Sequence, residues 1–106
     1  MLYDKRWEKP EAAVELEPWQ KTLLAAADLI EREGWIQGRR YKQGVGYCVL
    51  GAVSKIWTGD PDDWWPPDTF TALRRCIEYN PIAWNDIQGR TKAEVIQLLR
   101  QAVKEV

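Results

Sequence analysis

The chain has 106 residues, of which 45% are hydrophobic and 29% are charged, and its net charge is −1. This balance is typical of one small globular domain and excludes a disordered segment, while near neutrality leaves no overall field to attract nucleic acid. Histidine is absent from the sequence. Its absence removes the usual general base and most zinc sites, so we expect no metal or other cofactor, and a non-enzymatic protein is favoured.

The start of the chain and its two cysteines indicate where the protein resides. Met1 to Trp7 contains charged residues and no apolar signal core, and no stretch approaches the ~18 apolar residues of a membrane span. Cys48 and Cys76 each lie in an apolar run, which favours buried thiols over a disulfide. We therefore expect a cytoplasmic protein that does not bind membranes.

Residues 1–17 alternate charged and apolar positions without a sustained period. Pro10 divides them, and a short helical turn would fit from Pro10 to Leu16. We interpret residues 1–17 as an N-terminal arm and residues 18–106 as a single helical domain.

The first helix is predicted from Pro18 to Glu33. Proline suits the first helical position, and apolar residues such as Leu23 and Ile30 recur with helical spacing. Gly34 follows as the expected stop. In the left-handed conformation it would form a Schellman cap that packs Trp35 back onto Ile30.

The middle of the chain combines a glycine-rich segment with an apolar one. Trp35 to Gly46 is predicted to be a loop or a short irregular hairpin because of its glycines. Tyr47 to Trp57 is a nearly unbroken apolar run, whose length favours a helix at the centre of the fold around Leu50 and Val53. Gly51 would let a neighbouring backbone approach that helix closely.

A loop and a third helix follow. Asp60 to Pro67 contains three prolines and three aspartates, so we expect a loop there. Asp68 or Thr69 is predicted to cap a helix that extends to about Tyr79. Asn80-Pro81 is expected to end this helix.

The C-terminal helix is the best specified element. After a tight connection from Ile82 to Arg90, Thr91 and Glu94 match a capping box, and apolar residues from Val95 to Val103 keep the spacing of one helix face. These patterns predict a mainly α fold, a compact irregular bundle of about four helices with two long structured loops.

Four short motifs form an ordered series along the chain: Gly34-Trp35-Ile36-Gln37-Gly38, Cys48-Val49-Leu50-Gly51-Ala52, Trp84-Asn85-Asp86, and Gly89-Arg90-Thr91-Lys92-Ala93-Glu94-Val95. The series resembles a family of small uncharacterised bacterial and phage proteins, over about residues 19 to 105. The resemblance implies a small helical domain and supplies neither an activity nor catalytic residues. Members usually carry a variable segment in place of Asp60 to Pro67, so the resemblance implies no role for the tryptophans there.

The seven tryptophans favour a binding or regulatory domain. Trp64 and Trp65 are adjacent in a proline-bearing loop and cannot easily both point into one core, so at least one is expected at the surface. Trp57 would extend the same patch. The alternative is that both indoles of the loop form a lid over the bundle. We expect Trp57, Trp64 and Trp65 to bind a protein partner or a second copy of the chain.

A second hypothesis is a small hydrolase or transferase that uses Cys48. The residue lies near the predicted start of a helix, where the helix dipole lowers a thiol pKa, and Asn85 or Asp86 would be its polar companion. Because no histidine base is present, an inert packed thiol is favoured.

Three further polar groups are candidates for binding. The run Arg39-Arg40-Tyr41-Lys42 beside glycines would bind phosphate or a nucleic-acid backbone, although phosphate-loop fingerprints are missing and a solvated loop is favoured. Arg90 with Trp84-Asn85-Asp86 would form a polar pocket. The favoured alternative is that these residues form a turn with a purely structural role. The aspartates of residues 60–68 lack the EF-hand spacing, which disfavours a metal site.

Overall fold

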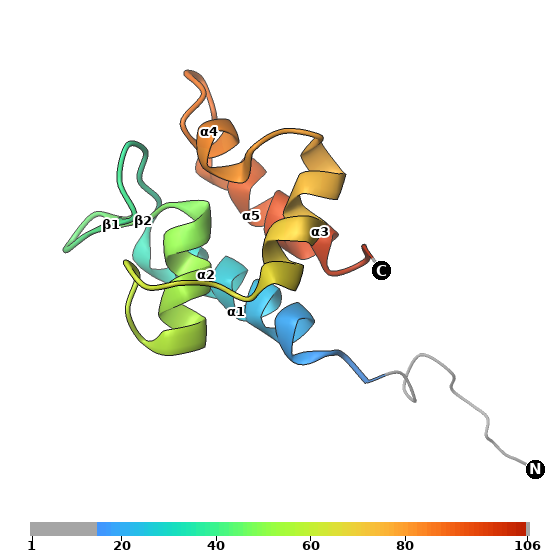
Figure 1. Ribbon diagram of the computed structural model, residues 1–106. Coiled ribbons are helices and arrows are strands. Elements are labelled where there is room, and N and C mark those ends of the chain that lie inside the picture. Colours follow the sequence, from blue (N-terminus) through green and yellow to red (C-terminus); the bar gives the residue numbers. More distant parts are fainter. Residues whose placement is uncertain (1–14, 106) are drawn as a thin grey trace, which may run out of the picture.

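The computed structural model describes residues 15–105, so most of the expected turn from Pro10 to Leu16 lies outside the described residues. Within them the fold is mainly α, as predicted, and consists of five helices and one two-stranded hairpin (Figure 1). The elements are α1 (Pro18–Glu33), β1 (Tyr41–Lys42), β2 (Gly46–Tyr47), α2 (Val49–Thr58), α3 (Pro67–Ile77), α4 (Pro81–Asn85) and α5 (Lys92–Ala102).

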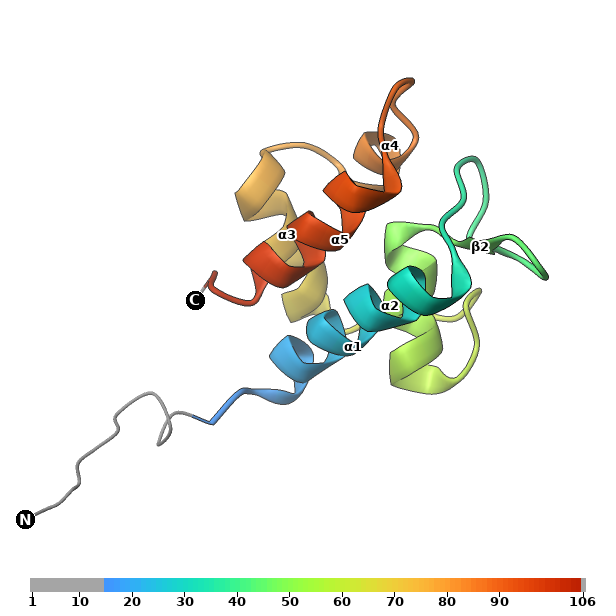
Figure 2. The same cartoon turned by 180° about the vertical axis from the view of Figure 1, so that it is seen from behind.

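Helix α1 forms the centre of the fold. It packs against α2 on one side and against α5 and α3 on the other, as both views of the cartoon show (Figures 1 and 2). Its start is fixed by Pro18 and by a capping box between Glu17 and Gln20. The Gln20 amide also donates a 2.7 Å hydrogen bond to the carbonyl of Val103, which ties the start of α1 to the end of α5.

The end of α1 differs from the prediction. Gly34 caps the helix, and its amide donates to the carbonyl of Ile30, but its φ of 108° and ψ of 169° are not left-handed. The predicted Schellman geometry is therefore wrong. The reason is tertiary, because the amide of Tyr47 donates to the carbonyl of Gly34 and the backbone of Gly46 lies against it. A Cβ at Gly34 would clash with the carbonyl of Val45, so this close backbone contact requires glycine.

The predicted irregular hairpin is confirmed, with Tyr41 paired to Tyr47 in an antiparallel register. Helix α2 begins two residues later than predicted, because Tyr47 belongs to β2 and Cys48 is the N-cap. Gly51 faces the hairpin, and a Cβ there would clash with the carbonyl oxygen of Arg40. The close approach expected at Gly51 is therefore present.

The central position predicted for α2 holds for its first half alone. Leu50 and Val53 are fully buried, whereas Ile56 and Trp57 are exposed. Helix α2 contacts α1, α4 and β2, and its residues are buried from Val49 to Ser54 and exposed from Lys55 to Thr58. This exposed end carries one of the predicted contact tryptophans.

Two predictions, the N-cap of α3 and the connection after it, are wrong. Pro66 occupies the N-cap of α3 and Pro67 its first position, so neither Asp68 nor Thr69 is the cap. Pro66 precedes Pro67, and a residue before proline is restricted to extended conformations. The helix therefore begins at Pro67. Asn80 caps α4, a short helix that lies where the sequence predicts a tight connection. The Asn80 side chain accepts from the amides of Ile82 and Ala83.

The capping box of α5 is confirmed. The Thr91 hydroxyl accepts from the amide of Glu94, and the Glu94 carboxylate accepts from the amide of Thr91. No helix among residues 15–105 is long and apolar enough to cross a membrane.

Candidate functional site

Asn85 is the centre of a buried hydrogen-bond network. Its side chain is fully buried, and its Oδ1 accepts from the indole Nε1 of Trp35 at 2.7 Å and from the amide of Val49 at 3.0 Å. Its Nδ2 donates to the carbonyl of Ile36 at 3.2 Å and to the carboxylate of Asp86 at 2.9 Å. One side chain thereby joins the end of α4, the start of α2 and the segment after α1.

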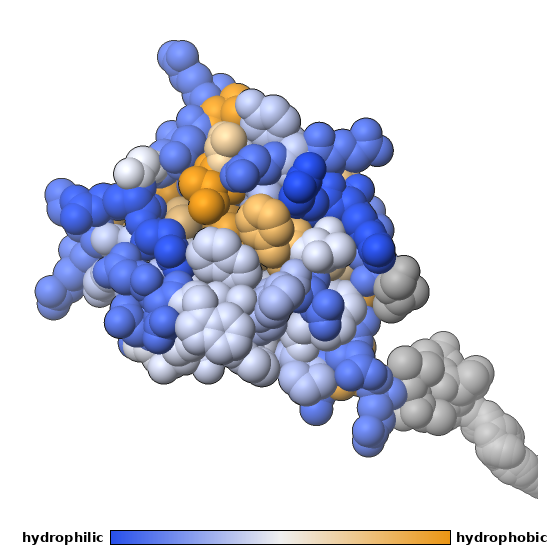
Figure 3. All heavy atoms as spheres, in the orientation of Figure 1, coloured by the Kyte–Doolittle hydropathy of each residue, from blue (hydrophilic) through white to orange (hydrophobic). Residues whose placement is uncertain are grey.

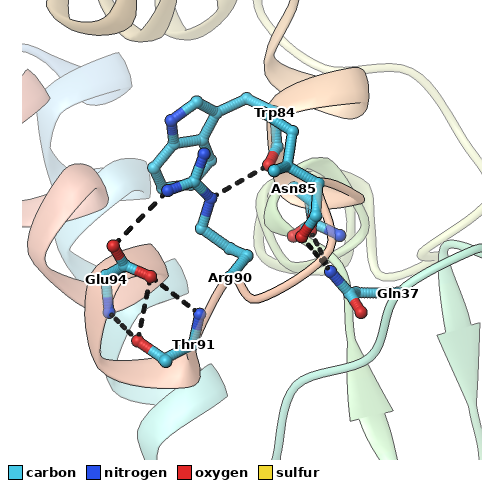
Figure 4. Close-up of polar contacts among 7 residues, drawn as sticks. Gln37, Trp84, Asn85, Arg90, Thr91 and Glu94 are labelled. Carbon is cyan, nitrogen blue, oxygen red and sulfur yellow. Dashed lines mark hydrogen bonds and ion pairs between the residues drawn. The ribbon is translucent and has the colours of Figure 1, made fainter.

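Neighbouring residues of the same two motifs complete this connection. Gln37 donates from its amide to the carbonyls of Asn85 and Ile87, at 3.0 and 2.9 Å (Figure 4). The amide of Gly38 donates to the carboxylate of Asp86 at 2.9 Å. The motif Gly34 to Gly38 and the motif Trp84-Asn85-Asp86 are therefore hydrogen-bonded to each other.

The structure places Cys48 close to its predicted companions but in an unreactive environment. The thiol is 3% exposed and accepts from the amide of Gly51 at 3.2 Å, so it caps α2. Burial raises the pKa of Cys48 and outweighs the lowering by the backbone amides of Gly51 and Leu50 and by Arg40, while the carboxylate of Asp86 makes the smallest contribution, upward. The pKa is thus opposite to the depression that the nucleophile hypothesis requires.

The pocket beside Cys48 is small. It has a volume of about 130 Å³, and the residues that line it are Gly38, Arg39, Arg40, Cys48, Ile82 and Asp86. Asn85 is a neutral amide and no base, and Asp86 Oδ1 accepts from the Gly38 amide and from Asn85 Nδ2. Among the described residues the hydrogen bond to the Cys48 sulfur comes from the Gly51 amide, so no base is bonded to the thiol.

Arg40 is committed to the fold. Its Nη2 donates to the hydroxyl of Ser54 and to the carbonyl of Asp63, each at 2.6 Å, and its guanidinium lies 4.9 Å from the ring centroid of Trp65. It connects the hairpin to α2 and to the loop that follows α2. Arg39 and Lys42 are exposed, so the predicted basic run does not converge on one phosphate-sized site.

Arg90, like Arg40, makes its contacts within the fold. Its guanidinium stacks 3.8 Å from the ring centroid of Trp84, its Nε donates to the carbonyl of Trp84, and its Nη1 lies 3.4 Å from the Glu94 carboxylate (Figure 4). The ring face of Trp84 and the Nε and Nη1 groups of Arg90 are therefore occupied by contacts within the chain. Arg90 and the Trp84-Asn85-Asp86 turn therefore lock α4 to the start of α5, as the structural interpretation predicts.

The tryptophans of α2 and of the following loop separate into exposed and packed ones. Trp57 and Trp64 are 41% and 57% exposed, and their rings meet edge to face with centroids 6.4 Å apart. Trp65 is half-buried and stacks on Phe70 at 5.9 Å. We call the exposed pair the Trp57–Trp64 surface. Figure 3 shows pale ring-bearing side chains gathered over α2 and the loop after it, next to hydrophilic groups.

The loop that holds Trp64 is well supported by hydrogen bonds. The amide of Asp62 donates to the Asp60 carboxylate at 2.9 Å, and the amide of Trp64 donates to the Asp63 carboxylate at 2.8 Å. The carbonyl of Asp63 accepts from both Arg40 and Ser54. Within the described part of the chain, no three acidic or cysteine side chains come together as metal ligands.

A larger groove lies between α3 and α5. Its volume is about 430 Å³, and its lining includes Trp84, Gln97, Gln101 and Cys76. Burial raises the pKa of the Cys76 thiol, and the carboxylate of Glu105 raises it further. The lining also includes Arg75, Glu94 and Glu105, so the groove is polar and carries charges of both signs.

The comparisons with known proteins place the chain in a family. Residues 15–105 match the model of a family of unknown function, DUF6197, and the chain belongs to this family. No curated protein and no solved structure matches the chain.

The structure gives Asn85 and Ser54 roles that the sequence does not predict. Asn85 is predicted as a companion of Cys48, whereas in the structure it is the centre of the network. Ser54 lies in the predicted apolar run, and in the structure it is fully buried and donates to the carbonyl of Asp63 at 2.9 Å. A hydroxyl inside an apolar helix needs a buried partner, and that rule could have indicated a contact for Ser54.

Proposed function

We propose that this domain is a non-enzymatic binding module whose contact site for a protein partner is the Trp57–Trp64 surface. The observation that carries the proposal is the exposure of two adjacent indoles, 41% for Trp57 and 57% for Trp64. Tryptophan is the residue most enriched at binding hot spots, and a pair of exposed rings offers a large apolar area. Burial of such an area by a partner would stabilise the complex.

The support beneath the surface favours binding as well. Trp65 stacks on Phe70 and lies under the guanidinium of Arg40, and Arg40 bonds to the carbonyl of Asp63 next to Trp64. These contacts hold the loop in one conformation. A preorganised loop loses little conformational entropy on binding, which increases affinity.

The first test uses a random peptide library displayed on phage and selected against the immobilised domain. Peptides enriched on the wild type should bind the Trp57→Ala/Trp64→Ala variant at least about tenfold more weakly, because each removed indole is a hot-spot contact of ~1–2 kcal/mol. Tyr79→Ala is the matched control, because Tyr79 is an aromatic residue that is 50% exposed at the end of α3. Circular dichroism verifies that all variants are folded.

Sedimentation velocity measures self-association on the same variants, since a second copy of the chain is the other expected partner. Weaker self-association of the double variant than of Tyr79→Ala would identify the second copy as an occupant of the surface. If the double variant matches the wild type in both peptide binding and self-association, the proposed function is wrong.

A further inference from the structure

The Trp57–Trp64 surface is bordered by carboxylates that form no ion pair with another described residue. Asp60, Asp62 and Asp63 precede Trp64 directly and are all exposed. The ion pairs among residues 15–105 are Arg32 with Glu33, Arg90 with Glu94, and Arg100 with Asp28 and Glu31. None of these involves the three aspartates. Two cations reach the same loop through main-chain carbonyls, Lys55 at Gly59 and Arg40 at Asp63. Three carboxylates against these two cations leave the rim with an excess of negative charge within the described residues.

Two tryptophan rings of the described chain are each covered by the guanidinium of an arginine that also donates to an oxygen atom nearby. Arg90 stacks over Trp84 at 3.8 Å while it bonds to the carbonyl of Trp84 and pairs with Glu94. Arg40 lies 4.9 Å from the ring of Trp65 while it bonds to the carbonyl of Asp63. In both cases a guanidinium lies over a ring face and donates to a main-chain carbonyl, that of Trp84 itself or that of Asp63, two residues before Trp65.

Trp64 has two aspartates next to it in the chain and no guanidinium over its ring within the described residues. Its ring is 57% exposed, the Asp63 carboxylate accepts from its own amide, and Asp62 is next to it in the loop. No arginine or lysine of the described chain lies over this ring, since the two cation–ring contacts there involve Trp65 and Trp84. The site therefore offers an aromatic face and negative charge to an external cation.

We infer that the partner is a protein segment bearing arginine, whose guanidinium stacks on Trp64 and pairs with the carboxylates of Asp62 and Asp63. This inference rests on the proposed function, because it assigns the chemistry of the partner at the same surface. Arginine fits better than lysine, since its planar guanidinium can stack on an indole while the N–H groups around its edge donate to carboxylates. Apolar residues next to the arginine would cover Trp57.

The test uses four synthetic peptides of equal length and the same apolar residues, which carry arginine, lysine, glutamine or glutamate at two positions. Binding is measured by titration of the isotope-labelled domain, with the indole N–H signals of Trp57 and Trp64 as the readout. The arginine peptide should bind about tenfold more tightly than the glutamine peptide, since two exposed charge contacts and one cation–ring contact add up to this factor. Its affinity should fall as salt is raised from 50 to 300 mM, about the range over which the Debye length halves.

Matched variants separate the carboxylates from the general charge of the protein. Asp62→Asn/Asp63→Asn keeps an acceptor for the amide of Trp64 and should weaken the arginine peptide several-fold, while it leaves the glutamine peptide unchanged. Glu15→Gln/Glu33→Gln removes the same charge from two exposed positions before and at the end of α1, and it should have no effect.

The outcomes distinguish the inference from the proposed function. If the glutamine peptide binds as well as the arginine peptide and both shift the Trp64 signal, the inference fails and the proposed contact surface stands. If the arginine peptide binds with equal affinity to Trp64→Ala, the contact surface itself is wrong. No detectable binding of the arginine peptide at millimolar concentration also overturns the inference. If the double variant Asp62→Asn/Asp63→Asn binds like the wild type, pairing with these carboxylates is refuted.

Discussion

Replacement of Asn85 by alanine should strongly destabilise the domain. The substitution removes the acceptor for the Trp35 indole and for the Val49 amide, and Val49 is fully buried. It also leaves the carbonyl of Ile36 without its donor. Each buried polar group without a partner costs about 1–3 kcal/mol, and partial access of water to the vacated space offsets part of the sum. We expect a loss of about 3–5 kcal/mol in the free energy of unfolding.

The assay is urea unfolding followed by far-UV circular dichroism, with Asn80→Ala as the control. Asn80 also accepts two backbone hydrogen bonds, from Ile82 and Ala83, but it does so at the surface. Loss of this N-cap should cost about 1 kcal/mol. If Asn85→Ala destabilises the protein no more than Asn80→Ala does, the network is not a stabilising centre and the reasoning is refuted.

A second substitution at the same position tests the charge environment of the network. Asn85→Asp retains the acceptor for Trp35 but places a buried carboxyl within hydrogen-bond distance of Asp86. Burial and the neighbouring carboxylate raise the pKa of the introduced group, so its stability contribution is present below its unfolded pKa and is lost as pH rises through the folded pKa. The deficit relative to wild type should shrink as pH falls from 7 to 5, and a deficit independent of pH would contradict this account.

Three other substitutions or treatments have defined expected outcomes. Gly51→Ala in a free helix would be favourable by about 1 kcal/mol, but here the clash with the Arg40 carbonyl should make it destabilising by more than ~2 kcal/mol in urea unfolding. Native stability equal to or above wild type would show that the contact is not tight. Cys48 should react with iodoacetamide at least about a hundredfold faster in urea than in the native state at pH 7.5, because burial raises its pKa and blocks access; equal rates would restore the nucleophile hypothesis. The amide of Thr91 lowers the pKa of Glu94, so this carboxylate stabilises the fold above its unfolded pKa of about 4.3 and the contribution is lost as pH falls through the lower folded value. Glu94→Gln should therefore show a smaller loss of Tm than wild type between pH 5 and pH 3, and identical acid profiles would count against the cap.

The tertiary structure decided the contacts that give the residues of the candidate sites their roles. The bond between Trp35 and Asn85 joins residues 50 apart in the chain, and the bond between Arg40 and Asp63 joins residues 23 apart. Spacing along the chain carries no information on such partners. The sequence therefore predicts Arg40 as a phosphate ligand and Asn85 as a companion of a thiol, whereas each bonds within the fold. The exposure of Trp57 was equally undetermined, because it depends on how far the hairpin and α4 extend along α2.

The sequence by itself determined the features that are encoded within a few residues. Pro18 and the Thr91–Glu94 capping box marked the helix starts correctly, and the apolar run from Tyr47 to Trp57 placed Leu50 and Val53 in the core, where both are fully buried. These signals are reliable because caps and amphipathic faces depend on neighbours three or four positions away. Local sequence patterns do not determine the conformation of Gly34 at the end of α1. A backbone contact with Gly46 of the hairpin sets that conformation, and no pattern within a few residues of Gly34 contains this contact.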